Sequence, residues 1–183
     1  MERSLTRRQF LQATAAGGAL CLSGGRILSA AALSNKPVLV SPGCRGTKVR
    51  VGKVYLGRPG ALWPTPKMDI NAEVRRYEAK FAGMKKELAD VEFVGNDLIT
   101  TSDQAKKIRE KLKDVDGILA IHLSMGAMGM LGDVLAIGKP TVLFAAPYSG
   151  HEWTGFGALR NRKEGALLEC MLTTDYDQLA VAV

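Results

Sequence analysis

Side chains that could bind a small polar molecule follow three strand-like runs of the sequence. His122 ends the run GILAIHL, while His151, Glu152 and Trp153 follow the next run, TVLFAA. Trp63 lies after an earlier run, VRVGKVYL. Imidazole and carboxylate groups hydrogen-bond to hydroxyl groups, and an exposed tryptophan is an apolar ring with a polar handle. These five residues are the predicted substrate-binding set for a sugar, and the sequence assigns no catalytic residue.

The same residue types raise the question of a metal site. Two histidines and a carboxylate at one sheet edge are a possible ligand set, and Asp97 and Asp133 add carboxylates nearby. The chain has only two histidines, and both aspartates fall where helix capping or solvation explains them. A hydrogen-bonding pocket wall is therefore the favoured interpretation, and we expect no metal and no other cofactor in this chain.

The glycine-rich run at residues 126–132, GAMGMLG, follows a strand-like run and begins a helical pattern. Backbone N–H groups at such a position can hold an anion. However, its spacing is G-x-x-G-x-x-G and not the dinucleotide pattern G-x-G-x-x-G. The chain also contains no P-loop and no G-x-S-x-G nucleophile motif. The glycines are better explained by a tight turn and close helix packing.

These residues require a framework, and the hydrophobic periodicity supplies one. Strands are expected at residues 49–56, 91–94, 117–123, 141–146 and 166–172, and helices at 70–88, 101–113, 128–137 and from about 174 onward. Alternating strands and helices predict a doubly wound α/β domain of the flavodoxin or Rossmann kind, with four or five parallel strands. Ligands bind beyond the carboxyl ends of such strands, which here means residues 57–66, 95–101, 122–129 and 146–155.

The amino-terminal sequence Thr6-Arg7-Arg8-Gln9-Phe10-Leu11 is typical of a twin-arginine export signal. We expect a signal peptide at residues 1–32, a linker at 33–48 and the α/β domain at 49–183. The translocon that reads this signal is then a partner, and the protein is extracytoplasmic or periplasmic. The apolar part of the signal is shorter than the ~20 residues that span a bilayer, so no stable membrane insertion is expected.

The charge and the cysteine content of the chain bear on its possible partners and on disulfide formation. The formal charge of +7 includes four arginines and one glutamate in residues 1–32, and the remaining charges are mixed in sign. Nucleic-acid binding favours a clustered basic face, so no nucleic-acid partner is expected. Of the three cysteines, Cys21 lies in the signal, and Cys170 lies in an apolar run that favours a buried, inert thiol over a disulfide with Cys44.

Several short segments of the chain also occur in a recognisable order: GRP at 57–59, WPT at 63–65, GILAIH at 117–122, PTVLF at 140–144 and TTDY at 173–176. Together they resemble the amino-terminal domain of the L-fucose and L-arabinose isomerase superfamily, particularly its exported, twin-arginine-bearing relatives. The resemblance implies a longer, homo-oligomeric protein that interconverts aldoses and ketoses with manganese. It implies that metal ligands and acid–base groups lie in later domains, so that this chain is non-catalytic and contributes to a sugar pocket and to oligomer packing.

Two further hypotheses remain open. The chain is alternatively a free-standing periplasmic module that binds a sugar or another small polar molecule, or a flavodoxin-like nucleotide or redox domain. The last helical pattern begins at Thr174-Asp175-Tyr176-Asp177 and stops after barely two turns. That pattern favours a fragment of a longer protein.

Overall fold

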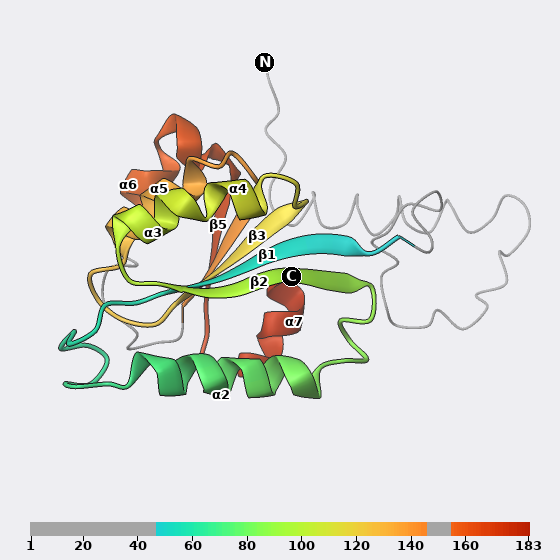
Figure 1. Ribbon diagram of the computed structural model, residues 1–183, viewed down its shortest axis with the longest axis horizontal. Helices are drawn as coiled ribbons and strands as arrows, with labels where there is room; N and C mark the ends of the chain where they lie inside the picture. The colour runs from blue at the N-terminus through green and yellow to red at the C-terminus, as the bar shows by residue number, and fades with distance from the viewer. Residues whose placement is uncertain (1–46, 146–154) are drawn as a thin grey trace, which may run out of the picture. The chain divides into compact units, whose positions relative to one another are not determined.

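The computed structural model describes residues 47–145 and 155–183 of the chain (Figure 1). The chain divides into two units, Met1–Arg45 and Gly46–Val183, and every element described below belongs to the second. The predicted signal peptide and nearly all of the predicted linker lie outside the described residues. No helix among the described residues is long and apolar enough to cross a membrane.

Five parallel strands form one sheet in the order β2-β1-β3-β4-β5. The strands are β1 Val49–Leu56, β2 Val91–Ile99, β3 Gly117–His122, β4 Thr141–Ala145 and β5 Leu168–Leu172. The helices are α2 Ile70–Gly83, α3 Ser102–Lys107, α4 Arg109–Leu112, α5 Met128–Leu135, α6 Phe156–Arg160 and α7 Leu179–Ala182, with short 3-10 turns at Lys163–Leu167 and Tyr176–Gln178. The predicted α/β fold with a doubly wound parallel sheet is confirmed.

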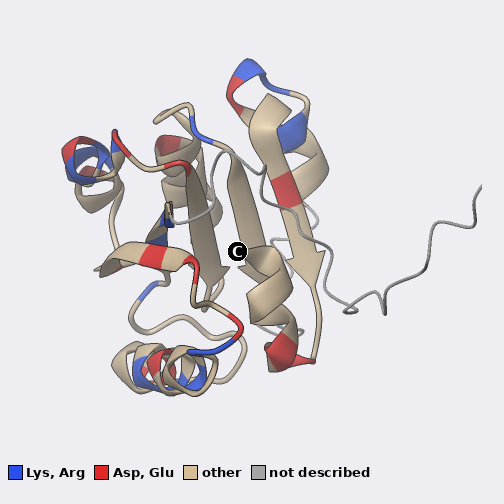
Figure 2. Ribbon diagram, turned by 90° about the vertical axis from the view of Figure 1, so that its right-hand side faces the viewer, with Lys and Arg blue, Asp and Glu red and all other residues tan. Residues whose placement is uncertain are grey.

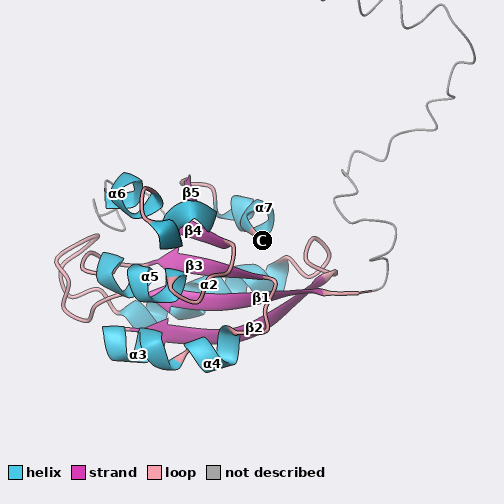
Figure 3. Ribbon diagram, turned by 90° about the horizontal axis from the view of Figure 1, so that it is seen from above, coloured by secondary structure: helices cyan, strands magenta, loops and turns pink. Residues whose placement is uncertain are grey.

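Helices cover both faces of the sheet (Figures 1 and 3). α2 and α7 pack on one face with Tyr55, Ile121 and Phe144. The other face carries α3, α4, α5 and α6, which pack on the alternate strand residues such as Val54 and Ala120. Residues 51–56 of β1 and nearly all of β3 are therefore buried, which explains why the sequence of β3 is a nearly continuous apolar run.

Several element boundaries differ from the sequence prediction, for example the split of the helix expected at 101–113 into α3 and α4, and the ends of α2 and β2 differ most. α2 begins as expected, because the Asp69 carboxylate accepts hydrogen bonds from the N–H groups of Asn71 and Ala72, but it ends at Gly83 and not near residue 88. β2 was expected to end before Gly95, yet it continues to Ile99. Gly95 has a φ of 80°, and the pairing with β1 gains one extra residue there, because Gly52 pairs with Val94 and Val54 pairs with Asp97. Gly95 therefore lies in a β-bulge within β2 and not in a turn that ends the strand.

A buried ion pair links β1 to α2. Lys53, only 4% exposed, points to the α2 face, where its Nζ lies 2.7 and 2.8 Å from the two carboxylate oxygens of Glu78. The Tyr55 hydroxyl donates to the same carboxylate at 2.6 Å. The Lys53 ammonium also lies 4.5 and 4.6 Å from the ring centroids of Phe81 and Phe93. The charge is thus compensated by a carboxylate and two aromatic faces, as a buried cation requires.

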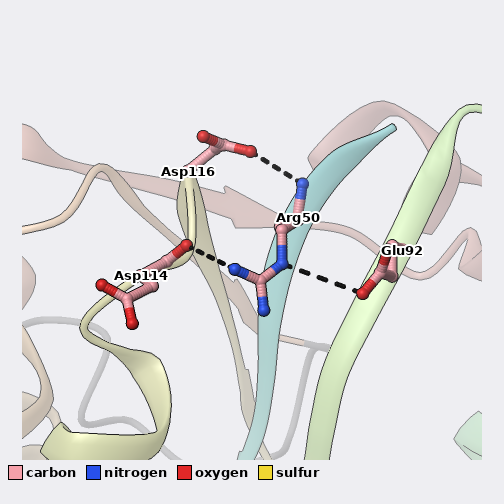
Figure 4. Close-up of polar contacts among 4 residues, drawn as sticks. All are labelled: Arg50, Glu92, Asp114 and Asp116. Carbon is pink, nitrogen blue, oxygen red and sulfur yellow. Dashed lines mark hydrogen bonds and ion pairs between the residues drawn. The ribbon is translucent and has the colours of Figure 1, made fainter. Parts of the chain in front are cut away.

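A second polar cluster fixes the amino-terminal end of β1 (Figure 4). The backbone N–H of Arg50 donates to Asp116 at 2.8 Å, and its guanidinium donates to the Asp114 carbonyl at 3.0 Å. The same guanidinium lies 3.8 Å from Glu92 on β2. Arg50 therefore aligns β1 with the starts of both neighbouring strands. Elsewhere on the helices, basic and acidic residues are interspersed and not gathered on one element (Figure 2).

Replacing Glu78 with glutamine tests the buried pair. Glu78→Gln leaves the Lys53 ammonium buried without its counter-charge, and we expect a loss of about 2 kcal/mol in the free energy of unfolding, reduced from the fully buried case because Glu78 is one-third exposed. Urea denaturation measures the change. Glu87→Gln, at an exposed position, is the control and should be neutral. A Glu78→Gln protein as stable as the parent contradicts a structural role for the pair.

Candidate functional site

The strand order places a topological switch point between β1 and β3. From β1 the chain crosses through α2 on one face to β2, whereas from β3 it crosses through α5 on the other face to β4. The loops after β1 and β3 therefore diverge, and such divergence is where open α/β sheets bind ligands. We call this region the switch-point edge and define it by Gly57, Arg58 and Trp63 after β1 and by Ser124 and Gly126 after β3.

Hydrogen bonds hold the two loops together. The Leu123 N–H donates to the Leu56 carbonyl at 2.8 Å, which continues the β1–β3 pairing beyond the strands. The Arg58 N–H donates to the hydroxyl of Ser124 at 2.7 Å, and Ser124 is fully buried. Further along, the Met125 N–H donates to the Trp63 carbonyl at 3.3 Å. The loop after β1 is thus fixed against the β3–α5 turn at two points.

Arg58 lies directly over that turn. Gly126 has a φ of 92°, and a Cβ added to it would lie 2.6 Å from the Cδ of Arg58. Only glycine combines this left-handed backbone with so close an approach. The stem of Arg58 therefore packs on the glycine, while the residue as a whole is exposed. α5 begins just beyond, and its N-cap residue Ala127 makes no side-chain cap hydrogen bond.

The predicted site residues fall into two groups. Trp63 and His122 both lie at this edge: Trp63 is 42% exposed in the loop after β1, and His122 is the last residue of β3, opposite Leu56. His122 is only 2% exposed and already engaged within the protein, so it is part of the wall beneath the edge. His151, Glu152 and Trp153 lie outside the described residues.

The structure also bears on the sequence interpretations of Asp97, of a metal site and of Cys170. Asp97 was placed in a turn at the ligand-binding edge, but it lies within β2 and pairs with Lys111 of α4. Within residues 47–145 and 155–183, no group of three histidine, cysteine, aspartate or glutamate side chains could hold a metal ion. Cys170 is a free thiol on β5, and burial, followed by the nearby Glu169 charge, raises its pKa, so the reactive thiolate is disfavoured.

Arg58, Ser124 and Gly126 were not in the predicted set, although the loops that contain them were. In the sequence, Arg58 is an ordinary cation in a loop, and Ser124 is one residue of a turn. Their importance comes from a contact between positions 66 residues apart. The signal available in the sequence was the pair of glycine-containing loops after two apolar strands, and it indicated the edge but not the residues.

A separate surface hollow of about 350 Å³ lies between α5 and the 3-10 turn at Lys163–Leu167. Gly129 and Gly132 form one wall, and Asp133, Arg162 and Glu164 supply polar groups of both signs. None of its lining residues is among the five that define the switch-point edge. It contains none of the predicted site residues.

Comparisons with known proteins identify no family for this chain. No family model matches the chain, and no curated protein is similar to it. Among solved structures, the CMP N-glycosidase BcmB of Clostridium botulinum is similar, with 14% sequence identity and a TM-score of 0.41 over 72% of this chain and 95% of that one. A likeness at this level carries no inference about function.

The expected membership of the L-fucose and L-arabinose isomerase superfamily is wrong. No family model matches the chain, and the CMP N-glycosidase found among the solved structures belongs to a different family. The resemblance rested on the order and apolar texture of short segments. Buried parallel strands of unrelated proteins share that texture, because both of their faces pack against helices.

Substitution of Gly126 tests the geometry of the edge. Gly126→Ala introduces a Cβ that must displace Arg58 and adopt a left-handed backbone, which costs about 1–2 kcal/mol. We expect that loss in chemical denaturation. Gly129→Ala, in α5 with nothing within 4 Å of the added carbon, is the matched control and should be neutral or stabilising by up to about 1 kcal/mol. Equal effects of the two substitutions contradict the close approach of Arg58.

Proposed function

We propose that this chain is a binding module for a small polar molecule, with its ligand at the switch-point edge. The observation that supports the proposal is the strand order β2-β1-β3-β4-β5, which makes the loops after β1 and β3 diverge at the centre of the sheet. Proteins of this topology bind ligands there. The exposed residues Arg58 and Trp63 suit a molecule with both polar groups and an apolar face.

A nucleotide or redox cofactor is the second candidate ligand. The same strand order is that of flavodoxin, whose flavin lies at the β1/β3 switch point. Against it, the first four residues of the β1 loop, Gly57-Arg58-Pro59-Gly60, carry none of the hydroxyl side chains that a phosphate-binding loop usually provides. A bound flavin would colour the purified protein, so its visible absorption spectrum distinguishes the two candidates.

A ligand screen with a matched pair of serine variants tests the proposal. We expect the full chain to bind a member of a panel of neutral sugars, sugar acids and nucleotides, with amide NMR shifts in residues 57–60 and 123–126. Ser124→Ala removes the hydroxyl that holds the Arg58 backbone and should weaken that binding by roughly tenfold. Ser102→Ala, exposed on α3, should bind normally.

Two results would count against the proposal. Binding that shifts amides only around the hollow between α5 and the Lys163–Leu167 turn would place the site elsewhere. No binding by any panel member, in a protein whose spectrum shows a folded domain, would remove the small-molecule function.

We also propose that the module works outside the cytoplasm, exported through the twin-arginine signal at its amino terminus. Arg7→Lys together with Arg8→Lys should abolish export of a folded reporter fused after residue 32, because the pathway reads the arginine pair. Arg26→Lys, a conservative change elsewhere in the same segment, is the control and should leave export intact. Fractionation of cells expressing the fusion measures the outcome, and export of the double variant would contradict the proposal.

A further inference from the structure

The arginines of the described domain differ in their partners. Arg58 forms no ion pair or side-chain hydrogen bond with another residue of 47–145 or 155–183. Four of the six other described arginines lie within 4 Å of a carboxylate: Arg50, Arg75, Arg76 and Arg160. Arg109 and Arg162 likewise form no ion pair with a described residue, so what distinguishes Arg58 is that its unpaired guanidinium belongs to the switch-point edge.

Arg58 is nonetheless held in place. Its N–H donates to the buried Ser124 hydroxyl at 2.7 Å, and its stem packs on Gly126, whose missing side chain makes the approach possible. An exposed arginine ordinarily keeps its rotamer freedom, and fixing the side chain costs entropy. Here the backbone and the stem are fixed in advance, while the guanidinium remains in solvent at the edge. Such pre-organisation lowers the cost of binding a partner.

From these contacts we propose that Arg58 is the recognition residue for an oxyanion, a phosphate or carboxylate group, on the ligand of the switch-point edge. The planar guanidinium presents donors that match the paired oxygens of either group. The inference rests on the proposed small-molecule function and narrows it: the ligand is an acidic molecule, such as a sugar acid or a phosphate ester, and not a neutral sugar.

The test uses inorganic phosphate, acetate and glucose as probes of the full chain, followed by amide NMR shifts. Phosphate or acetate should cause saturable shifts in residues 57–60 and 123–126, and glucose should bind more weakly. Arg58→Gln should weaken the anion binding at least tenfold, the loss of about one charge-assisted hydrogen bond. Arg58→Lys, which keeps the cation but not the fork, should retain part of it. Whether phosphate or acetate binds more tightly distinguishes the two oxyanions.

Arg109→Met is the matched control, because Arg109 is an exposed arginine on α4 without an ion pair to a described residue; it should bind like the parent. If Arg58→Gln does not fold, Arg58→Lys is compared with the parent protein instead. The inference would be overturned if the parent and Arg58→Lys each bound glucose as tightly as phosphate. Anion shifts that survive in Arg58→Gln would also overturn it. Binding of glucose alone at the edge would overturn the anion inference but leave the binding function standing, whereas binding of no probe and no panel member would overturn both.

Discussion

The buried pair of Lys53 and Glu78 is the constraint on which the first crossover of this fold depends. A cation inside the sheet–helix layer is tolerated only when a carboxylate reaches it, so α2 must lie with Glu78 over the middle of β1. The loop of residues 57–69 joins these two elements and carries Arg58 and Trp63. The ion pair thus fixes both ends of the segment from which half of the switch-point edge is built. Burial and the hydrogen bond to the same carboxylate also raise the pKa of Tyr55, which therefore remains a neutral donor.

The other half of the edge depends on β3. Ser124 is buried directly after the strand, and its hydroxyl both accepts from the Arg58 N–H and lies within 3.4 Å of the Arg58 carbonyl. Gly126 then turns the chain into α5 with a backbone that side chains avoid. The loop after β1 and the turn after β3 thereby place one cation, Arg58, at the switch-point edge. The site is small, but each of its contacts has a structural cause within the described domain.

The sequence predicted the strands well because periodicity reports burial, and β1, β3 and β4 are buried on both faces. The sequence prediction was less successful where one residue type is compatible with two local structures. Gly95 was interpreted as the end of a strand, whereas it forms a bulge that keeps β2 paired to β1. The family resemblance failed for a related reason: apolar strands in a common order identify a kind of layer packing and not a lineage. Trp63 and His122 lie at the carboxyl edge of the sheet because that position follows from strand direction alone, and their role in binding a ligand stays a prediction.

The sequence by itself determined the class of fold, the number of strands to within one and the loops that end them, since these follow from local periodicity and from turn-forming residues. Only the tertiary structure decided the order of the strands, and hence that β1 and β3 are neighbours with diverging connections. It alone paired Lys53 with Glu78 and brought Arg58 onto Ser124 and Gly126. Such contacts join positions far apart in the chain, and their free energy arises from burial and desolvation, which no single segment of sequence contains.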